Sequence, residues 1–173
     1  MKILGGNILV DNKIIIRETS RDDLDNIMKL WNNGEVMKFV GFPHGLGTTI
    51  KNLEKWIIQA IKLPYRCHYS IYLEDGTYCG ETFYNTDVNT KTAALDIKLL
   101  PIVQGKGIAS EALLYTIDKA FEEGKAERVY VEPHKDNISA WKLYERLGFV
   151  SKPRPVYLED NDVYLEIERD EWI

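Results

Sequence analysis

The chain has 173 residues, of which 45% are hydrophobic and 28% charged, and its formal net charge is −5. This composition is ordinary for one soluble globular domain spanning residues 1–173, and no run approaches the roughly 18 apolar residues that a membrane span needs. The acidic balance argues against a nucleic-acid partner, because such binding depends on neutralising phosphates, and it is compatible with a cationic amine substrate.

The N-terminus and the cysteine and histidine content predict a cytoplasmic protein without a metal site. The first residues lack the apolar core and cleavage site of a secretory signal. Cys67 and Cys79 are too few for a disulfide framework and are expected as free thiols in a reducing compartment. The histidines are scattered without metal-ligand spacing, and we expect His44 and His68 to be surface or hydrogen-bonded residues.

The chain is expected to open with a hairpin and two helices. Apolar runs flank the turn pair Asp11-Asn12, which predicts a hairpin over residues 7–18. Ser20 is expected to cap a helix, with Asp23 three residues later, and Asn33-Gly34 to end it. The spacing of the apolar residues predicts a buried helical face of Leu24, Ile27, Met28 and Trp31.

A second helix is expected to begin at Thr48 or Thr49 and to stop before Pro64. Alternating residues and turn pairs then predict a meander of three strands at 68–73, 78–85 and 93–99. The remaining elements are expected to be a helix at 107–123, a strand at 127–132, a helix at 138–147 and strands near 149–157 and 162–168. This mixed order indicates an α+β fold, with helices on both faces of a mixed, mainly antiparallel sheet.

The most informative segment is the glycine-bearing turn before the helix at 107–123. Gly105 and Gly107 would allow a ligand to approach the unpaired backbone N–H groups at the positive end of that helix, and Lys106 adds positive charge. The segment has neither the G-x-x-x-x-G-K-[ST] pattern of nucleotide triphosphate sites nor the G-x-G-x-x-G pattern of dinucleotide sites. By spacing alone, a phosphate site and a simple tight turn both remain open.

Two motifs in this half of the chain resemble the GCN5-related N-acetyltransferase (GNAT) family. Gln104-Gly105-Lys106-Gly107-Ile108-Ala109 matches every fixed position of the family's [Gln/Arg]-x-x-Gly-x-[Gly/Ala] cofactor motif. The segment from Asn137 to Phe149 resembles the family's Asn-x-x-[Ala/Ser]-x-x-x-Tyr-x-x-x-Gly-Phe pattern. The resemblance is strong over residues 95–149 and loose over the rest of the chain.

The resemblance implies a fold in which two parallel strands, 93–99 and 127–132, splay apart around the pantetheine arm of acetyl-CoA. Backbone groups of Ile97 and Leu99 would contact that arm, and Asn137 and Ala140 would lie beside the cofactor. The pyrophosphate would be held by Gln104, Gly105, Lys106, Gly107, Ile108, Ala109 and Ser110.

The resemblance also implies direct attack of an amine on the thioester. The departing thiolate needs a proton, and Tyr144 is our candidate donor, with packing against its helical neighbours as the alternative role. Glu81 and Asp96 are equal candidates for the base that deprotonates the amine, and Glu132 is a weaker third. A backbone N–H near Leu99 is the candidate donor to the oxyanion.

Three functions remain open at this stage. The first is acetylation of a small amine, an aminoglycoside-like polyamine or a peptide N-terminal amine. The second is a non-catalytic acyl-CoA sensor with the same cleft, and the third is another kind of phosphate- or nucleotide-binding protein. The sequence leaves the oligomeric state open, with a homodimer among the expectations.

Overall fold

The computed structural model describes residues 14–60, 63–158 and 163–172. Its elements, in chain order, are β1 (Ile14–Glu18), η1 (Arg21–Asp23), α1 (Leu24–Trp31), α2 (Gly34–Met37), η2 (Lys38–Val40), α3 (Ile50–Ala60), β2 (Arg66–Leu73), β3 (Tyr78–Asp87), β4 (Thr92–Leu99), η3 (Pro101–Val103), α4 (Ile108–Glu122), β5 (Arg128–Val131), α5 (Ile138–Arg146), β6 (Val150–Ser151), β7 (Leu165–Glu168) and η4 (Arg169–Glu171). Among the described helices, none has both the length and the apolar character required to cross a membrane.

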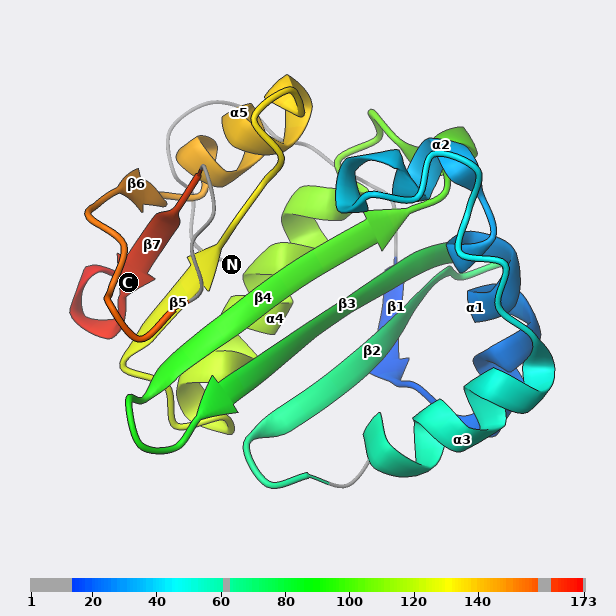
Figure 1. The fold of residues 1–173 in the computed structure, drawn as a ribbon, viewed down its shortest axis with the longest axis horizontal. Coiled ribbons are helices and arrows are strands. Elements are labelled where there is room, and N and C mark those ends of the chain that lie inside the picture. The colour runs from blue at the N-terminus through cyan, green and yellow to red at the C-terminus, as the bar shows by residue number, and fades with distance from the viewer. Residues whose placement is uncertain (1–13, 61–62, 159–162, 173) are drawn as a thin grey trace.

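The described strands form one seven-stranded sheet in the order β1-β2-β3-β4-β5-β7-β6. Among them, β4 and β5 are the one parallel pair, and the other neighbours run antiparallel. Helix α4 lies behind the sheet in Figure 1, whereas α1 and α3 lie to its right and α2 lies above the end of β4. The expected α+β fold, mixed and mainly antiparallel, is therefore confirmed.

The predicted helix starts follow from local capping. Ser20 and Asp23 form the expected capping box, with the Asp23 carboxylate accepting from the Ser20 N–H at 2.8 Å. At α3, Thr49 Oγ1 accepts a hydrogen bond from the Asn52 N–H at 3.3 Å, which selects Thr49 over Thr48 as the cap. Side-chain acceptors satisfy helix-end amides that have no partner within the helix.

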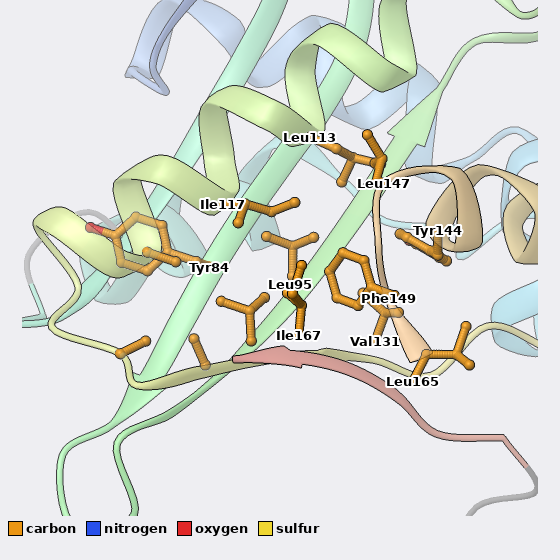
Figure 2. Packing of buried hydrophobic residues seen from close by; sticks show 14 of the residues in the cluster. Tyr84, Leu95, Leu113, Ile117, Val131, Tyr144, Leu147, Phe149, Leu165 and Ile167 are labelled. Atoms are coloured by element: carbon orange, nitrogen blue, oxygen red, sulfur yellow. The ribbon is translucent and has the colours of Figure 1, made fainter. Parts of the chain in front are cut away.

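Helix α4 buries the apolar face that its sequence predicts, and it packs on β3 and β4. Figure 2 shows how its side chains meet those of the sheet and of α5 in the main core. A face of this kind recurs every three to four residues, which is the helical repeat. The buried positions include all six expected ones: Ile108, Ala112, Leu113, Ile117, Ala120 and Phe121.

Several boundaries differ from expectation. Helix α1 ends at Trp31, and Asn33 caps the short helix α2 because its side-chain oxygen accepts from the amide of Glu35 at 2.9 Å. The expected strand at 149–157 shrinks to Val150–Ser151, because Pro153 and Pro155 cannot donate ladder hydrogen bonds. The first strand and the turn of the hairpin expected at 7–18 lie outside the described residues.

Candidate functional site

The two parallel strands separate along their length. Strands β4 and β5 pair through Thr92 with Arg128, Ala93 with Val129 and Ala94 with Tyr130, and no further register pair joins them among the described residues. Strand β4 nevertheless continues to Leu99, still paired with β3 on its other side. In Figure 1 the two strands diverge towards α2 and α5. The second half of β4 therefore has an edge towards β5 that no strand covers.

Two adjoining cavities occupy this divergence. One, of about 280 Å³, lies between β4 and the segment after β5, and the other, of about 480 Å³, extends from the end of β4 to the start of α4. They have several wall residues in common, so they form one groove: Val36, Phe39, Ile97, Lys98, Asn137, Ala140 and Leu143.

The glycine-bearing turn forms one end of this groove. Gly105 and Gly107 have φ angles of 74° and 79°, a left-handed conformation that glycine adopts without strain. Gly107 is the N-cap of α4. Because glycine has no side chain, it accepts no hydrogen bond from the first-turn amides of α4 as a capping side chain would. The turn residues on the groove wall are Gln104, Gly105, Gly107, Ala109 and Ser110.

The other predicted turn residues take different positions. Ile108 is 1% exposed and packs in the core, so its side chain does not line the groove, and Lys106 is exposed and is not among the lining residues. The Gln104 side chain donates from Nε2 to the Leu99 carbonyl at 3.0 Å. This bond ties the turn to the end of β4, and we infer that Gln104 shapes the turn with its side chain.

Asn137 and Ala140 lie where the two cavities meet. The Asn137 side-chain oxygen accepts from the Ala140 N–H at 3.2 Å and so caps α5. The motif that begins at Asn137 therefore fixes the start of α5 at the middle of the groove, as well as lining it.

Ile97 and Leu99 lie on the β4 side of the groove. The Ile97 N–H, one of the backbone groups expected to contact the cofactor, donates to Asp96 Oδ1 at 2.8 Å. The Asp96 carboxylate therefore accepts from a backbone N–H of β4 where β4 and β5 separate, and Asp96 also lines the smaller cavity.

Tyr144 projects from α5 onto the wall of the smaller cavity. It is 4% exposed, and its ring packs edge-on against Phe149 with centroids 5.5 Å apart (Figure 2). Burial, and to a lesser degree the negative charge of Asp96, raises the pKa of the Tyr144 phenol well above its ordinary value. The phenol therefore keeps its proton and can act as a donor into the cavity.

Comparison with known proteins agrees with this geometry. The model of the acetyltransferase (GNAT) domain family matches residues 13–150. This chain belongs to the GNAT acetyltransferase family. The protein is therefore an acetyl-CoA-dependent N-acetyltransferase, with acetyl-CoA as its cosubstrate. No curated protein sequence matches the chain.

Solved structures share the fold of this GNAT acetyltransferase at low sequence identity. A spermidine N-acetyltransferase from Vibrio cholerae, in complex with CoA and spermine, superposes with a TM-score of 0.79 at 21% identity, over 92% of this chain and 97% of that one. A GNAT-family acetyltransferase from Streptococcus pneumoniae superposes with a TM-score of 0.73 at 19% identity, over 90% of this chain and 99% of that one.

The two carboxylates predicted as bases occupy different environments in this GNAT acetyltransferase. The Asp96 side chain is 35% exposed on the cavity wall and forms an ion pair with Lys98. Glu81 is 2% exposed and lies behind that wall, where its Oε1 is 3.6 Å from Lys98 Nζ. Sheet register explains this arrangement, because Glu81 on β3 is directly opposite Lys98 on β4.

The charge state of Glu81 is fixed by its partners. Burial alone would raise its pKa, but the charges of His68 and Lys98, with the hydrogen bond from Trp31, outweigh burial and lower the pKa. Burial would likewise lower the pKa of Lys98, and the carboxylates Asp96 and Glu81 raise it instead. Both side chains are therefore ionised in the folded protein.

Sequence reasoning missed the polar partners of Glu81. His68 is buried and hydrogen-bonded as expected, but its contact with Glu81 follows from the pairing of β2 with β3. Trp31 Nε1 donates to Glu81 Oε1 at 2.8 Å across fifty residues of sequence. The alternation of β3 indicates that Glu81 and Phe83 share a face, and this was the one available signal. Glu132 lines the cavity and is paired with Arg154.

Proposed function

We propose that this GNAT acetyltransferase transfers the acetyl group of acetyl-CoA to a primary amine by direct attack of the amine. The observation that carries the proposal is the cavity between the diverging strands, which is lined by both Tyr144 of α5 and Asp96 of β4. The Vibrio cholerae enzyme of the same fold, solved with CoA and spermine, supports an amine as the acceptor class.

The groove suits the shape and charge of acetyl-CoA. Its wider part begins at the first turn of α4, where unpaired amides and the helix dipole favour a diphosphate. A Cβ at Gly105 would meet no protein atom within 4 Å, so this part of the turn leaves room for a ligand. The uncovered edge of β4 would pair with the amide groups of the pantetheine arm. When bound, acetyl-CoA supplies an activated acyl group and a thiolate leaving group.

An alkylammonium has a pKa of about 10, so the acceptor is protonated near neutral pH and must lose a proton before its nitrogen can attack. Asp96 suits this role better than Glu81, because Asp96 lines the cavity. Glu81 does not line it and lies beside the cavity residue Lys98. A carboxylate at this position would hold the ammonium group and accept its proton. The Asp96–Ile97 hydrogen bond would be exchanged for contacts to the ligands.

Tyr144 would donate the proton that the departing thiolate needs. Its raised pKa keeps the phenol protonated, and its position on the cavity wall orients it towards the reaction. A backbone N–H at the end of β4, near Leu99, would stabilise the negative charge that develops on the thioester oxygen.

The test is thiol release from acetyl-CoA with a panel of amines, combined with mass spectrometry of the acceptor. We expect acetyl transfer to at least one of three acceptors: a polyamine such as spermine, an aminoglycoside or a peptide N-terminus. Tight acetyl-CoA binding without thiol release for every amine would instead support the acyl-CoA sensor. Because Tyr144 and Asp96 lie in the cavity, the structure favours catalysis over that alternative.

We also propose a cytoplasmic location for this enzyme. Cys67 and Cys79 are both free thiols, which supports a reducing compartment. Cell fractionation tests the location, and light scattering of the purified protein tests for a homodimer.

A further inference from the structure

The smaller cavity has a carboxylate from each of the two segments that diverge around it. The last register pair between β4 and β5 is Ala94 with Tyr130. Asp96 lies two residues beyond Ala94 on β4, and Glu132 lies two residues beyond Tyr130, just after β5 ends. All four residues line the cavity, so its charge is set largely by what surrounds these two carboxylates.

The Asp96 side of the cavity carries one unbalanced negative charge. Lys98 forms an ion pair with Asp96, and its Nζ also lies 3.6 Å from Glu81 Oε1. Two carboxylates therefore share one lysine. Asp96 is the carboxylate of this group that lines the cavity, and one ammonium group beside it would balance the charge.

The Glu132 side of the cavity is neutral as a unit. Arg154 forms an ion pair with Glu132, and the two side chains are only 14% and 26% exposed. The Arg154 guanidinium also donates to the Val163 carbonyl at 2.9 Å and lies 5.5 Å from the centre of the Tyr164 ring. A second ammonium group at Glu132 would therefore lose its hydration without gaining a free carboxylate.

The remaining wall of the smaller cavity is predominantly hydrophobic and aromatic. Phe39 and Val40 of η2 and Leu143 of α5 line it together with Tyr130. The Tyr130 ring stacks on the Tyr164 ring with centroids 5.6 Å apart, which holds it in position. Such a wall favours a ligand whose apolar part replaces water against it.

The larger cavity has the opposite charge balance. The charged residues among its described wall residues are Glu35, Lys38, Lys98 and Arg146, which are three cations against one carboxylate. An excess of positive charge suits the phosphates of the cofactor, whereas the smaller cavity suits a cation. The charges therefore assign the larger cavity to acetyl-CoA and the smaller one to the acceptor.

We propose that the acceptor carries a single ammonium group next to an apolar or aromatic body, and that the Glu132–Arg154 ion pair disfavours acceptors with a second ammonium group. This inference rests on the proposed amine acetylation and narrows its acceptor. A peptide N-terminus with an apolar first side chain fits this class, whereas spermine and aminoglycosides carry several ammonium groups. Arg154 acts through Glu132 and is a positioning residue, because it is not among the residues that line the cavity.

The first test compares hexylamine with hexamethylenediamine as acceptors for the full chain. The two amines have the same carbon chain, and the diamine carries a second ammonium group at its far end. Both present a primary alkylammonium, so the cost of deprotonation is alike. We expect kcat/KM to be about tenfold or more higher for hexylamine. An equal or higher kcat/KM for the diamine would overturn the inference.

The second test changes the ion pair. Arg154→Gln removes the cation and leaves the Glu132 carboxylate available to a ligand, so the ratio of kcat/KM for hexylamine to that for the diamine should fall about tenfold or more. Arg154→Lys keeps a cation at this position and is the matched control, whose ratio should stay close to that of the wild type. Competition between the two amines in one sample cancels differences in the amount of folded protein.

A purely structural role of Arg154 would lower both values of kcat/KM together. An unchanged ratio in Arg154→Gln would therefore contradict the inference, and if this variant does not fold, the wild-type comparison decides. Preference of the wild-type protein for spermine over hexylamine would also refute the inference and leave the amine acetyltransferase function standing. Absence of thiol release with every amine would instead refute the proposed function.

Discussion

Replacing Gly105 with alanine should weaken acetyl-CoA binding and should lower stability only through the strain of its backbone conformation. The added methyl group meets no protein atom within 4 Å, so its conformational cost comes from the left-handed backbone, where φ is 74°. That cost is about 1–2 kcal/mol for a residue with a Cβ, or a fall in Tm of roughly 2–8 °C. The methyl group borders the groove, however, and would push a diphosphate away from the turn amides.

Loss of one charge-assisted hydrogen bond costs about 1.5–3 kcal/mol, which corresponds to a 10- to 150-fold rise in Kd. The matched control is Gly47→Ala, because Gly47 has a φ of 68°, meets no atom within 4 Å and does not line either cavity. Calorimetric titration with acetyl-CoA and thermal unfolding should show equal losses of stability but weaker binding in the Gly105 variant alone. Equal affinity of the two variants would refute the assignment of the phosphate site.

Two further predictions concern protons. Tyr144→Phe should lower kcat about 100-fold and leave the Kd for acetyl-CoA within twofold, and an unchanged kcat would remove the donor role. In the wild-type protein, the rate should show no loss from tyrosine ionisation below about pH 10, because burial raises the pKa of Tyr144. Asp23→Asn should lower the free energy of unfolding by about 3 kcal/mol at pH 7, because the buried carboxylate binds Arg17, Tyr72 and the Ser20 N–H. The folded-state pKa of Asp23 is lowered, so its contribution is present above the unfolded pKa of about 3.9 and is lost as pH falls through the folded value. Denaturant unfolding at several pH values should show the gap between wild type and variant closing in acid, and a constant gap would contradict this reasoning.

The predictions that held were those governed by neighbouring residues. The capping box of Ser20 and Asp23 uses atoms three residues apart, and the buried face of α4 follows from the helical repeat. The turn expected at Gly105 and Gly107 before α4 is present, and its left-handed backbone conformation depends on residues within the turn itself. In each case the interaction is local, so its energy is largely independent of the rest of the fold.

The strand boundary that failed near the C-terminus was decided by strand pairing. A strand was expected near residues 149–157, but Pro153 and Pro155 leave only Val150–Ser151 paired with β7. In the same way, nothing near Asp96 indicates that its carboxylate binds the Ile97 N–H, since this depends on β5 having separated from that edge.

The sequence by itself determined the family, the capping box of Ser20 and Asp23 and the glycine turn before α4, because each is encoded in a short segment whose geometry is fixed by local backbone conformation. The tertiary structure decided which carboxylate lines the cavity and which is buried. The register of β3 against β4 places Glu81 behind Lys98, and the register of β2 against β3 brings His68 within 3.2 Å of it. These contacts join residues far apart in the chain, and their charges depend on burial, which exists only once the sheet and helices have packed.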